Sequence, residues 1–198
     1  PVCDLIVIPG SKTTIADLAA FRAEGWDIDL AAHVRRGGHV LGICGGYQML
    51  GRTLADPGGL EGPPGEVAGL GLLDVSTVMA PEKRLARVAA RHPASGTALA
   101  GYEIHLGHTT GPDTARGWLE RDGARIGAAS PDGRVRGCYL HGLFASDAFR
   151  GAFLRGLGAV PTEMDHGGTV DATLDALAGH MAEALNLDAI WDIARELP

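Results

Sequence analysis

The sequence has no excess of basic residues, no long apolar run and no even set of cysteines. Its 17 Lys and Arg against 24 Asp and Glu give a net charge of -7. This charge argues against non-specific binding to nucleic acid or to an anionic membrane, because both need a basic surface. No apolar run approaches the roughly 18–20 residues that a bilayer-spanning helix needs, and nothing resembles a signal peptide. Three cysteines, Cys3, Cys44 and Cys138, form no disulfide framework and suit a reducing cytoplasm, where one can be catalytic.

The order of apolar runs predicts an α/β fold with an open, mostly parallel sheet flanked by helices. Residues 3–8 and 39–44 are short apolar, β-branched runs typical of buried parallel strands. Between them, helical spacing continues to Gly37-Gly38, and Thr14 with Asp17 resembles a capping box. Residues 72–78, 85–90 and 100–106 predict strands of a more antiparallel middle section, and residues 134–140 predict another strand.

Other segments predict loops and helices. The Gly- and Pro-rich residues 56–71 read as a long surface loop. Ser146 is placed to cap a helix through Leu157. Near the end, apolar residues 174–185 recur at helical spacing, and Asp188 is placed to cap a last short helix. We expect residues 1–160 to form the main domain, and residues 161–198 to form a helical extension that packs on it.

The segment 42–48, Gly-Ile-Cys-Gly-Gly-Tyr-Gln, predicts a nucleophile elbow at Cys44. Glycines on both sides let the chain turn sharply and lift the thiol out of the sheet. The N-terminus of the following helix favours the thiolate and should lower the pKa of Cys44. We therefore expect Cys44 to be alkylated faster than Cys3 or Cys138 at pH 7. Both of those cysteines are interpreted as packing residues.

His141 is the predicted partner of Cys44. It lies at the carboxyl end of a predicted strand in the segment Gly-Cys-Tyr-Leu-His-Gly, at the sheet edge where α/β proteins bind ligands. A histidine facing the thiol can take its proton and later protonate a leaving amine.

Four ordered segments resemble a known family. The elbow is similar to that of class I (triad-type) glutamine amidotransferases. Three further segments resemble the signature of the cobyric acid synthase family: Pro-Gly-Ser-Lys-Thr-Thr-Ile-Ala-Asp-Leu at 9–18, Gly-Tyr-Glu-Ile-His-Leu-Gly-His-Thr at 101–109, and Tyr-Leu-His-Gly-Leu-Phe at 139–144. The resemblance runs from Cys3 to about Gly158. It implies a flavodoxin-like class I amidotransferase fold for residues 1–160.

The resemblance implies a role for each matching residue. Cys44 would attack the glutamine side-chain amide and form a thioester, with His141 as acid and base. The backbone N–H groups of Gly10 and Gly45 would form the oxyanion hole, and Gln48 would help to hold the substrate. The ammonia would serve an ATP-dependent synthetase that converts adenosylcobyrinic acid a,c-diamide to adenosylcobyric acid. No cofactor or metal is expected in this domain; ATP and Mg are expected only in the synthetase, which this sequence lacks.

The sequence departs from the family pattern at two places. The wider class carries a glutamate two residues after the base, and here that position is Leu143. The site is then a Cys–His dyad, or another group orients the histidine. Glu103 and His105 are the candidates, and they are also candidate substrate contacts. Glu103 is equally well read as a solvated strand residue or as a docking contact. The family fold also begins with a strand and helix ahead of Cys3; their apparent absence would leave an exposed sheet edge.

Three alternatives remain open at this stage. The chain could belong to the relative that amidates the a and c side chains of the corrinoid, or to a relative acting on cell-wall lipid precursors. The Pro-Gly-Ser-Lys form at 9–12 favours the cobyric acid synthase type. The chain could also be a non-catalytic docking module whose Gly-rich loop at 57–65 contacts a partner.

Overall fold

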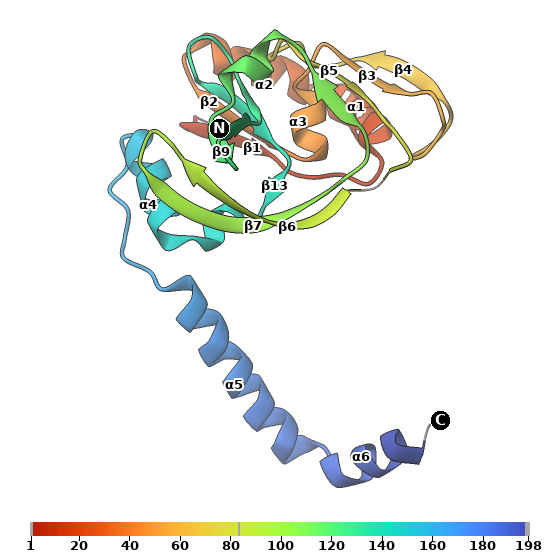
Figure 1. The fold of residues 1–198 in the computed structure, drawn as a ribbon, viewed down its shortest axis with the longest axis vertical. Helices are drawn as coiled ribbons and strands as arrows, with labels where there is room; N and C mark the ends of the chain where they lie inside the picture. Colours follow the sequence, from red (N-terminus) through yellow and green to blue (C-terminus); the bar gives the residue numbers. More distant parts are fainter. Residues whose placement is uncertain (1, 83, 197–198) are drawn as a thin grey trace. The chain divides into compact units, whose positions relative to one another are not determined.

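The protein is described by a computed structural model covering residues 2–82 and 84–196. The chain divides into two compact units, Pro1–Pro161 and Thr162–Pro198, which are described separately (Figure 1). None of the helices in the described part of the chain is both long and apolar enough to cross a membrane.

The sheet that carries the elbow is mostly parallel. Its order is β1-β2-β12-β11, with β1 (Leu5–Ile8) parallel to β2 (His39–Ile43) and β2 parallel to β12 (Val135–Cys138). The short β11 (Ala128–Ala129) is antiparallel to β12. Parallel strands bring their carboxyl ends to one edge, so the residues after β1, β2 and β12 meet there.

Two apolar clusters cover the two faces of this sheet. Val40 points into a cluster with the helical residues Leu18 and Leu30. Its neighbour Leu41 points into a second cluster with Phe149 and other apolar residues of the antiparallel region. Successive side chains of a strand alternate between faces, which explains the division. Each fully buried leucine contributes about 1.5–3 kcal/mol of stability.

The helices of the first unit differ in detail from the predicted ones. The predicted single helix is two, α1 (Thr14–Ala23) and α2 (Trp26–Arg35), because Gly25 adopts a left-handed φ of 72° between them. The predicted capping box is wrong. Thr14 is the first helical residue, and Asp17 accepts a hydrogen bond from the Ser11 hydroxyl. Helix α3 (Gly45–Met49) follows the elbow, and α4 (Asp147–Gly156) is capped by Ser146 as predicted.

The predicted antiparallel middle section is confirmed. Strands β6 (Arg84–His92) and β7 (Thr97–His105) form a long hairpin, visible as the curved pair in Figure 1. Their sheet has the order β10-β9-β6-β7-β13. The remaining strands of this sheet are short: β9 (Leu119–Arg121), β10 (Ala124–Ile126) and β13 (Leu140–His141).

The strand predicted at 134–140 is split between two sheets. Its first part is β12, which extends the parallel sheet, and it ends at Cys138. After Tyr139 the chain enters β13, which pairs antiparallel with β7 and places His141 opposite Tyr102. This change of sheet positions His141.

The predicted loop 56–71 contains part of a third sheet. Its order is β4-β3-β5-β8, formed by β3 (Thr53–Asp56), β4 (Gly65–Ala68), β5 (Ser76–Val78) and β8 (His108–Thr110). The prediction of a continuous loop is wrong because β4 pairs with β3. The strand predicted at 72–78 is confined to β5.

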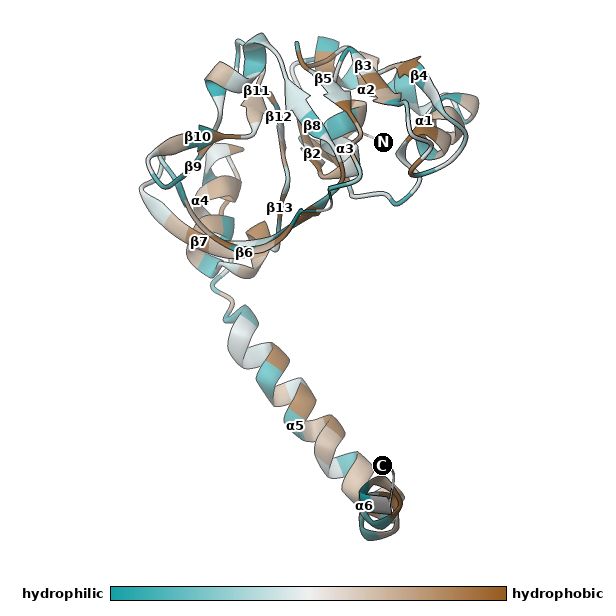
Figure 2. Ribbon diagram, turned by 45° about the vertical axis from the view of Figure 1, so that its right-hand side comes forward, coloured by the Kyte–Doolittle hydropathy of each residue, from teal (hydrophilic) through white to brown (hydrophobic). Residues whose placement is uncertain are grey.

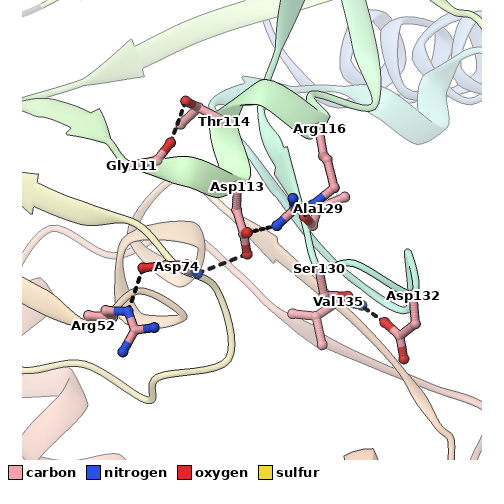
Figure 3. A network of polar contacts seen from close by, with 10 residues as sticks. All are labelled: Arg52, Asp74, Gly111, Asp113, Thr114, Arg116, Ala129, Ser130, Asp132 and Val135. Carbon is pink, nitrogen blue, oxygen red and sulfur yellow. Dashed lines mark hydrogen bonds and ion pairs between the residues drawn. The ribbon is translucent and has the colours of Figure 1, made fainter.

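A buried carboxylate links this third sheet to the first one. Asp113, in the 3-10 helix η1 (Pro112–Arg116), accepts a hydrogen bond of 2.8 Å from the Asp74 backbone N–H and pairs with Arg116. Arg116 also donates to the Ala129 carbonyl of β11 at 3.1 Å (Figure 3). Burial of an unpaired carboxylate would be costly, so these partners hold η1 between the sheets.

The second unit consists of α5 (His166–Ala184) and α6 (Leu187–Glu196). The predicted apolar stripe lies on α5 and ends just after it at Leu185, and its large apolar side chains are exposed. Apolar positions along α5 are brown on the ribbon in Figure 2. The prediction that Asp188 caps α6 is wrong, because the Asn186 side chain accepts from the Ala189 N–H at 3.1 Å. Packing of this extension on the first unit stays a prediction.

Candidate active site

The chain makes a sharp turn at Cys44, as the glycine pattern predicts. Cys44 follows β2 directly and has φ 54° and ψ -113°, a conformation that residues with a Cβ rarely adopt. Its N–H donates to the Cys138 carbonyl at 2.9 Å, and its carbonyl accepts from the Gln48 N–H at 3.1 Å. The elbow is therefore held by β12 on one side and by α3 on the other.

The glycines around Cys44 allow the loop after β1 to lie against the elbow. A Cβ on Gly46 would stand 2.1 Å from the Ile8 carbonyl oxygen. A Cβ on Gly45 would stand 2.8 Å from the Ser11 nitrogen. The Gly46 N–H also donates to the Pro9 carbonyl at 3.0 Å. Side chains at these positions would push the loop away from Cys44.

His141 and Cys44 meet around Gly10. A Cβ on Gly10 would lie 3.4 Å from Cε1 of His141 and 3.5 Å from Cβ of Cys44. The His141 ring stacks on Tyr102, with centroids 4.9 Å apart and planes 5° from parallel. Its Nε2 atom is buried and has no hydrogen-bond partner among the described residues. The imidazole is thus held in place with one nitrogen free.

The Ile104 backbone lies between the two groups. The Cys44 thiol donates to the Ile104 carbonyl, with Sγ 3.4 Å from the oxygen. Burial lowers the pKa of His141 below its ordinary 6.5, against the opposing effect of a backbone hydrogen bond with Ile104. The imidazole is therefore neutral near pH 7 and can accept a proton.

The lowered thiol pKa predicted from the sequence is wrong. Burial raises the pKa of Cys44; a backbone hydrogen bond with Gly45 opposes it, and the negative charge of Glu61 adds to it. Cys44 is only 7% exposed, and α3 is a helix of five residues, so desolvation outweighs the helix N-terminus. The resting pair is a thiol and a neutral imidazole.

Cys44 and His141 line a cavity of about 610 Å³ at the sheet edge. Its walls come from the loop after β1, the elbow, the loop after β3, β7 and β13. The lining residues are Gly10, Ser11, Lys12, Cys44, Gln48, Leu60, Glu61, Ile104, His105, Leu106 and His141. Of the predicted site residues, Cys44, His141, Gly10, Gln48 and His105 meet in this cavity, and Gly45 adjoins it.

Gln48 lines the cavity and joins three segments. Its Nε2 donates to the Leu106 carbonyl at 3.0 Å and to the Tyr139 hydroxyl at 3.3 Å. Its Oε1 accepts from the Thr14 hydroxyl at 3.4 Å. The fully bonded amide fixes the wall of the cavity.

Glu103 does not join the other candidates. Its carboxylate is buried and pairs with Arg84 at 2.5 Å and Arg121 at 2.9 Å. It lines a neighbouring cavity instead, because alternation along β7 turns it away from Tyr102. The reading of Glu103 as a solvated strand residue is wrong, because the side chain is buried; a contact of Glu103 with the substrate stays a prediction.

His105 lines both cavities and stacks on Tyr139, with centroids 3.7 Å apart. Burial lowers its pKa, and the charge of Glu103 opposes that shift. Its Nδ1 atom is buried without a hydrogen-bond partner among the described residues.

No carboxylate orients His141 within the described part of the chain. None of the groups that shift its pKa there is acidic. Leu143 occupies the position where the wider amidotransferase class carries a glutamate, and it is buried in the apolar cluster beside β13. The described residues therefore favour a Cys–His dyad, in which the His141 ring stacks on Tyr102 and hydrogen-bonds with the Ile104 backbone. Residues 2–82 and 84–196 also contain no His, Cys, Asp or Glu cluster suited to a metal ion.

Sequence reasoning missed the contributions of Glu61, Lys12 and Tyr102. Glu61 and Lys12 line the cavity, and Tyr102 stacks on the base. A signal for Glu61 existed in Asp56-Pro57-Gly58, where an acidic residue precedes a tight turn. The contact between Tyr102 and His141 depends on the pairing of β13 with β7, which no local pattern shows.

Comparison with known proteins identifies the family. The sequence model of the CobB/CobQ-like glutamine amidotransferase domain matches residues 1–149. The chain belongs to this family. A solved structure described as a glutamine amidotransferase has a TM-score of 0.54 and 18% identity, over 79% of this chain and 80% of that one. At this identity the likeness shows the shared fold.

Curated relatives are larger than this chain. The cobyric acid synthase of Cereibacter sphaeroides is 60% identical over 191 residues, which are 96% of this chain and 40% of that protein. The cobyric acid synthase of Rhodobacter capsulatus is 61% identical over 191 residues, with the same coverage of both chains. The chain thus spans about 40% of the length of these relatives.

Proposed function

We propose that this amidotransferase domain hydrolyses glutamine at Cys44 to supply ammonia within a cobyric acid synthase. The observation that carries the proposal is the geometry around Gly10. There the elbow residue Cys44, with its strained backbone, lies close to His141, whose Nε2 atom has no hydrogen-bond partner among the described residues. The high identity to cobyric acid synthases supports the pathway.

The first half of the reaction forms a thioester. Nε2 of His141 takes the thiol proton while Sγ of Cys44 attacks the side-chain amide carbon of glutamine. The negative charge on the amide oxygen is met by the backbone N–H groups of Gly10 and Gly45. His141 then returns its proton to the leaving nitrogen, the C–N bond breaks, and ammonia departs.

The second half regenerates the thiol. Water attacks the thioester carbon while His141 takes one of its protons. Collapse of the second tetrahedral species breaks the C–S bond, the proton passes to Sγ, and glutamate leaves. Both halves need a neutral imidazole at the start, which agrees with the lowered pKa of His141.

The partner of this domain would be an ATP-dependent synthetase that amidates corrinoid carboxylates. We propose that adenosylcobyrinic acid a,c-diamide is converted there to adenosylcobyric acid, with ATP and Mg bound by the synthetase. The relatives are named cobyric acid synthases and extend well beyond the part that this chain matches, which supports this proposal. Three free cysteines suit a reducing cytoplasm.

Amide-labelled glutamine tests the proposal. A full-length synthase containing this domain, given glutamine with ¹⁵N in the side-chain amide, should transfer ¹⁵N to the corrinoid product and release glutamate. The Cys44→Ala variant should transfer ¹⁵N from added ammonium chloride but not from glutamine. Transfer from glutamine by the variant would exclude Cys44 from the reaction. Loss of both transfers would show that the variant harms the synthetase.

A further inference from the structure

The loop after β3 is held firmly over the cysteine cavity. The Asp56 side chain is 1% exposed and accepts hydrogen bonds of 2.9 Å from the N–H groups of Leu60 and Glu61. Burial acts to raise the pKa of Asp56, but the backbone N–H groups outweigh it and hold the pKa below its usual value. An ionised Asp56 therefore fixes the backbone of the two cavity residues that follow.

The Glu61 carboxylate is bonded on one side only. Its Oε2 accepts a hydrogen bond of 2.7 Å from the Thr14 N–H at the start of α1. Its Oε1 has no hydrogen-bond or ion-pair partner among residues 2–82 and 84–196. A half-buried carboxylate oxygen without a partner can accept from a ligand donor.

The charges of the cavity match those of a free amino acid. Glu61 and Lys12 contribute one carboxylate and one ammonium to the lining that also holds Cys44. Glutamine bound with its amide carbon at Cys44 carries its α-ammonium and α-carboxylate on Cα, three bonds from the reacting carbon. An ammonium beside Glu61 would make a charge-assisted hydrogen bond to Oε1.

We propose that Glu61 is a charge switch: its carboxylate binds the α-ammonium of glutamine and, once neutralised, no longer opposes ionisation of the Cys44 thiol in the same cavity. The inference rests on the proposed function, because it gives that function its substrate-recognition residue. Burial is the main cause that raises the pKa of Cys44, and the negative charge of Glu61 adds to it. A bound ammonium reverses the effect of Glu61, so the nucleophile becomes reactive when the correct substrate arrives.

Binding affinities test the recognition half. The Cys44→Ser protein cannot form the thioester, so its dissociation constants can be measured by calorimetry for glutamine and for 5-amino-5-oxopentanoate. The second compound keeps the amide and carboxylate but lacks the α-ammonium. We expect glutamine to bind roughly tenfold or more tightly. Adding Glu61→Gln should bring the two constants within about twofold, because the neutral amide no longer attracts the ammonium.

Alkylation rates test the switch half. The protein with an intact Cys44 is treated with iodoacetamide, a neutral reagent, and the Cys44 peptide is followed by mass spectrometry. Glu61→Gln should speed this alkylation by about twofold or more, because removal of a nearby negative charge favours the thiolate. The new amide oxygen can still accept from the Thr14 N–H. Glu66→Gln, on exposed β4 outside the cavity lining, is the matched control and should change neither readout.

The outcomes are distinct. An unchanged preference for glutamine in the Glu61→Gln protein, or an unchanged alkylation rate of Cys44, overturns the charge switch. Both readouts are independent of turnover. If a full-length synthase with the wild-type domain releases no glutamate, the proposed function is contradicted. The binding preference and the alkylation rate still decide the role of Glu61 in that case.

Discussion

The carboxyl ends of β2 and β12 place two buried cysteines side by side in different environments. The Cys44 N–H donates to the Cys138 carbonyl, yet only Cys44 leaves its strand through a positive φ. Cys44 lines a cavity with His141, whereas Cys138 is 1% exposed and packs in the apolar cluster. Burial raises the pKa of Cys138 to about 12. The contrast indicates that the turn after the strand, more than burial of the sulfur, distinguishes the proposed nucleophile Cys44 from the packing residue Cys138.

The largest effect on activity is expected from replacing Cys44, the cysteine at the turn. Cys44→Ala should lower the rate of glutamate release by roughly 10⁴-fold or more, because the covalent route is lost. Glutamate release by the full-length synthase, assayed with a coupled dehydrogenase, measures it. A residual rate within tenfold of wild type would contradict the assignment.

The second largest effect is expected from replacing His141, the proposed base, which lies beside Cys44 and not beside Cys138. His141→Asn should lower glutamate release by about 10²–10⁴-fold, while calorimetric binding of glutamine stays within a few-fold. Loss of binding with an unaltered turnover number would instead make His141 a substrate contact.

The turn itself can be disrupted without touching either thiol. Gly46→Ala would place a Cβ against the Ile8 carbonyl, so it should destabilise the protein by about 1–3 kcal/mol and reduce glutamate release. Gly156→Ala, in α4 with open space around it, is the matched control and should be neutral or slightly stabilising. Urea unfolding of both variants decides the comparison; equal midpoints would count against a tight elbow.

Cys138→Ala should affect stability alone. Removing the buried sulfur leaves a small void and should cost about 1–2 kcal/mol, with glutamate release within about twofold of wild type. A large loss of activity at unchanged stability would show that Cys138 takes part in the site.

Dependence on pH gives the smallest effect. The pKa of His141 is lowered below 6.5 in the folded protein, so the base stays neutral at pH 6.5 and is lost only at lower pH. The acid limb of kcat/KM for glutamine should therefore lie below pH 6.5. A limb above pH 7 would contradict the neutral dyad.

The order of cysteine alkylation is revised by the structure. The sequence predicts Cys44 to react first, but Cys3 is exposed and Cys44 is buried with a raised pKa. In the absence of glutamine, we therefore expect Cys3 to be alkylated before Cys44, and Cys138 to be alkylated last.

Local patterns predicted the elbow well. Gly42, Gly45 and Gly46 surround Cys44 in sequence. A Cβ on Gly42 would meet residues a few positions away, and a Cβ on Gly45 or Gly46 would meet the end of β1 and the residues that follow it. The parallel sheet and the β6–β7 hairpin likewise follow from apolar runs and short connections.

Features that depend on tertiary pairing could not be predicted. The division of residues 134–140 between two sheets requires β7 as a partner for β13. Glu103 was misassigned because its arginine partners, Arg84 and Arg121, come from other strands. The direction of the Cys44 pKa depends on burial and on Glu61, 17 positions away in the sequence.

Covalent labelling with a glutamine analogue tests whether Cys44 is the nucleophile. The protein is incubated with 6-diazo-5-oxo-L-norleucine, an electrophilic glutamine analogue, and digested for peptide mapping by mass spectrometry. We predict one adduct, on the Cys44 peptide, that is slowed by glutamine, strongly reduced in His141→Asn and absent from Cys44→Ala. An unchanged intact mass, or an adduct on Cys3 or Cys138 in place of Cys44, would contradict the assignment of the nucleophile.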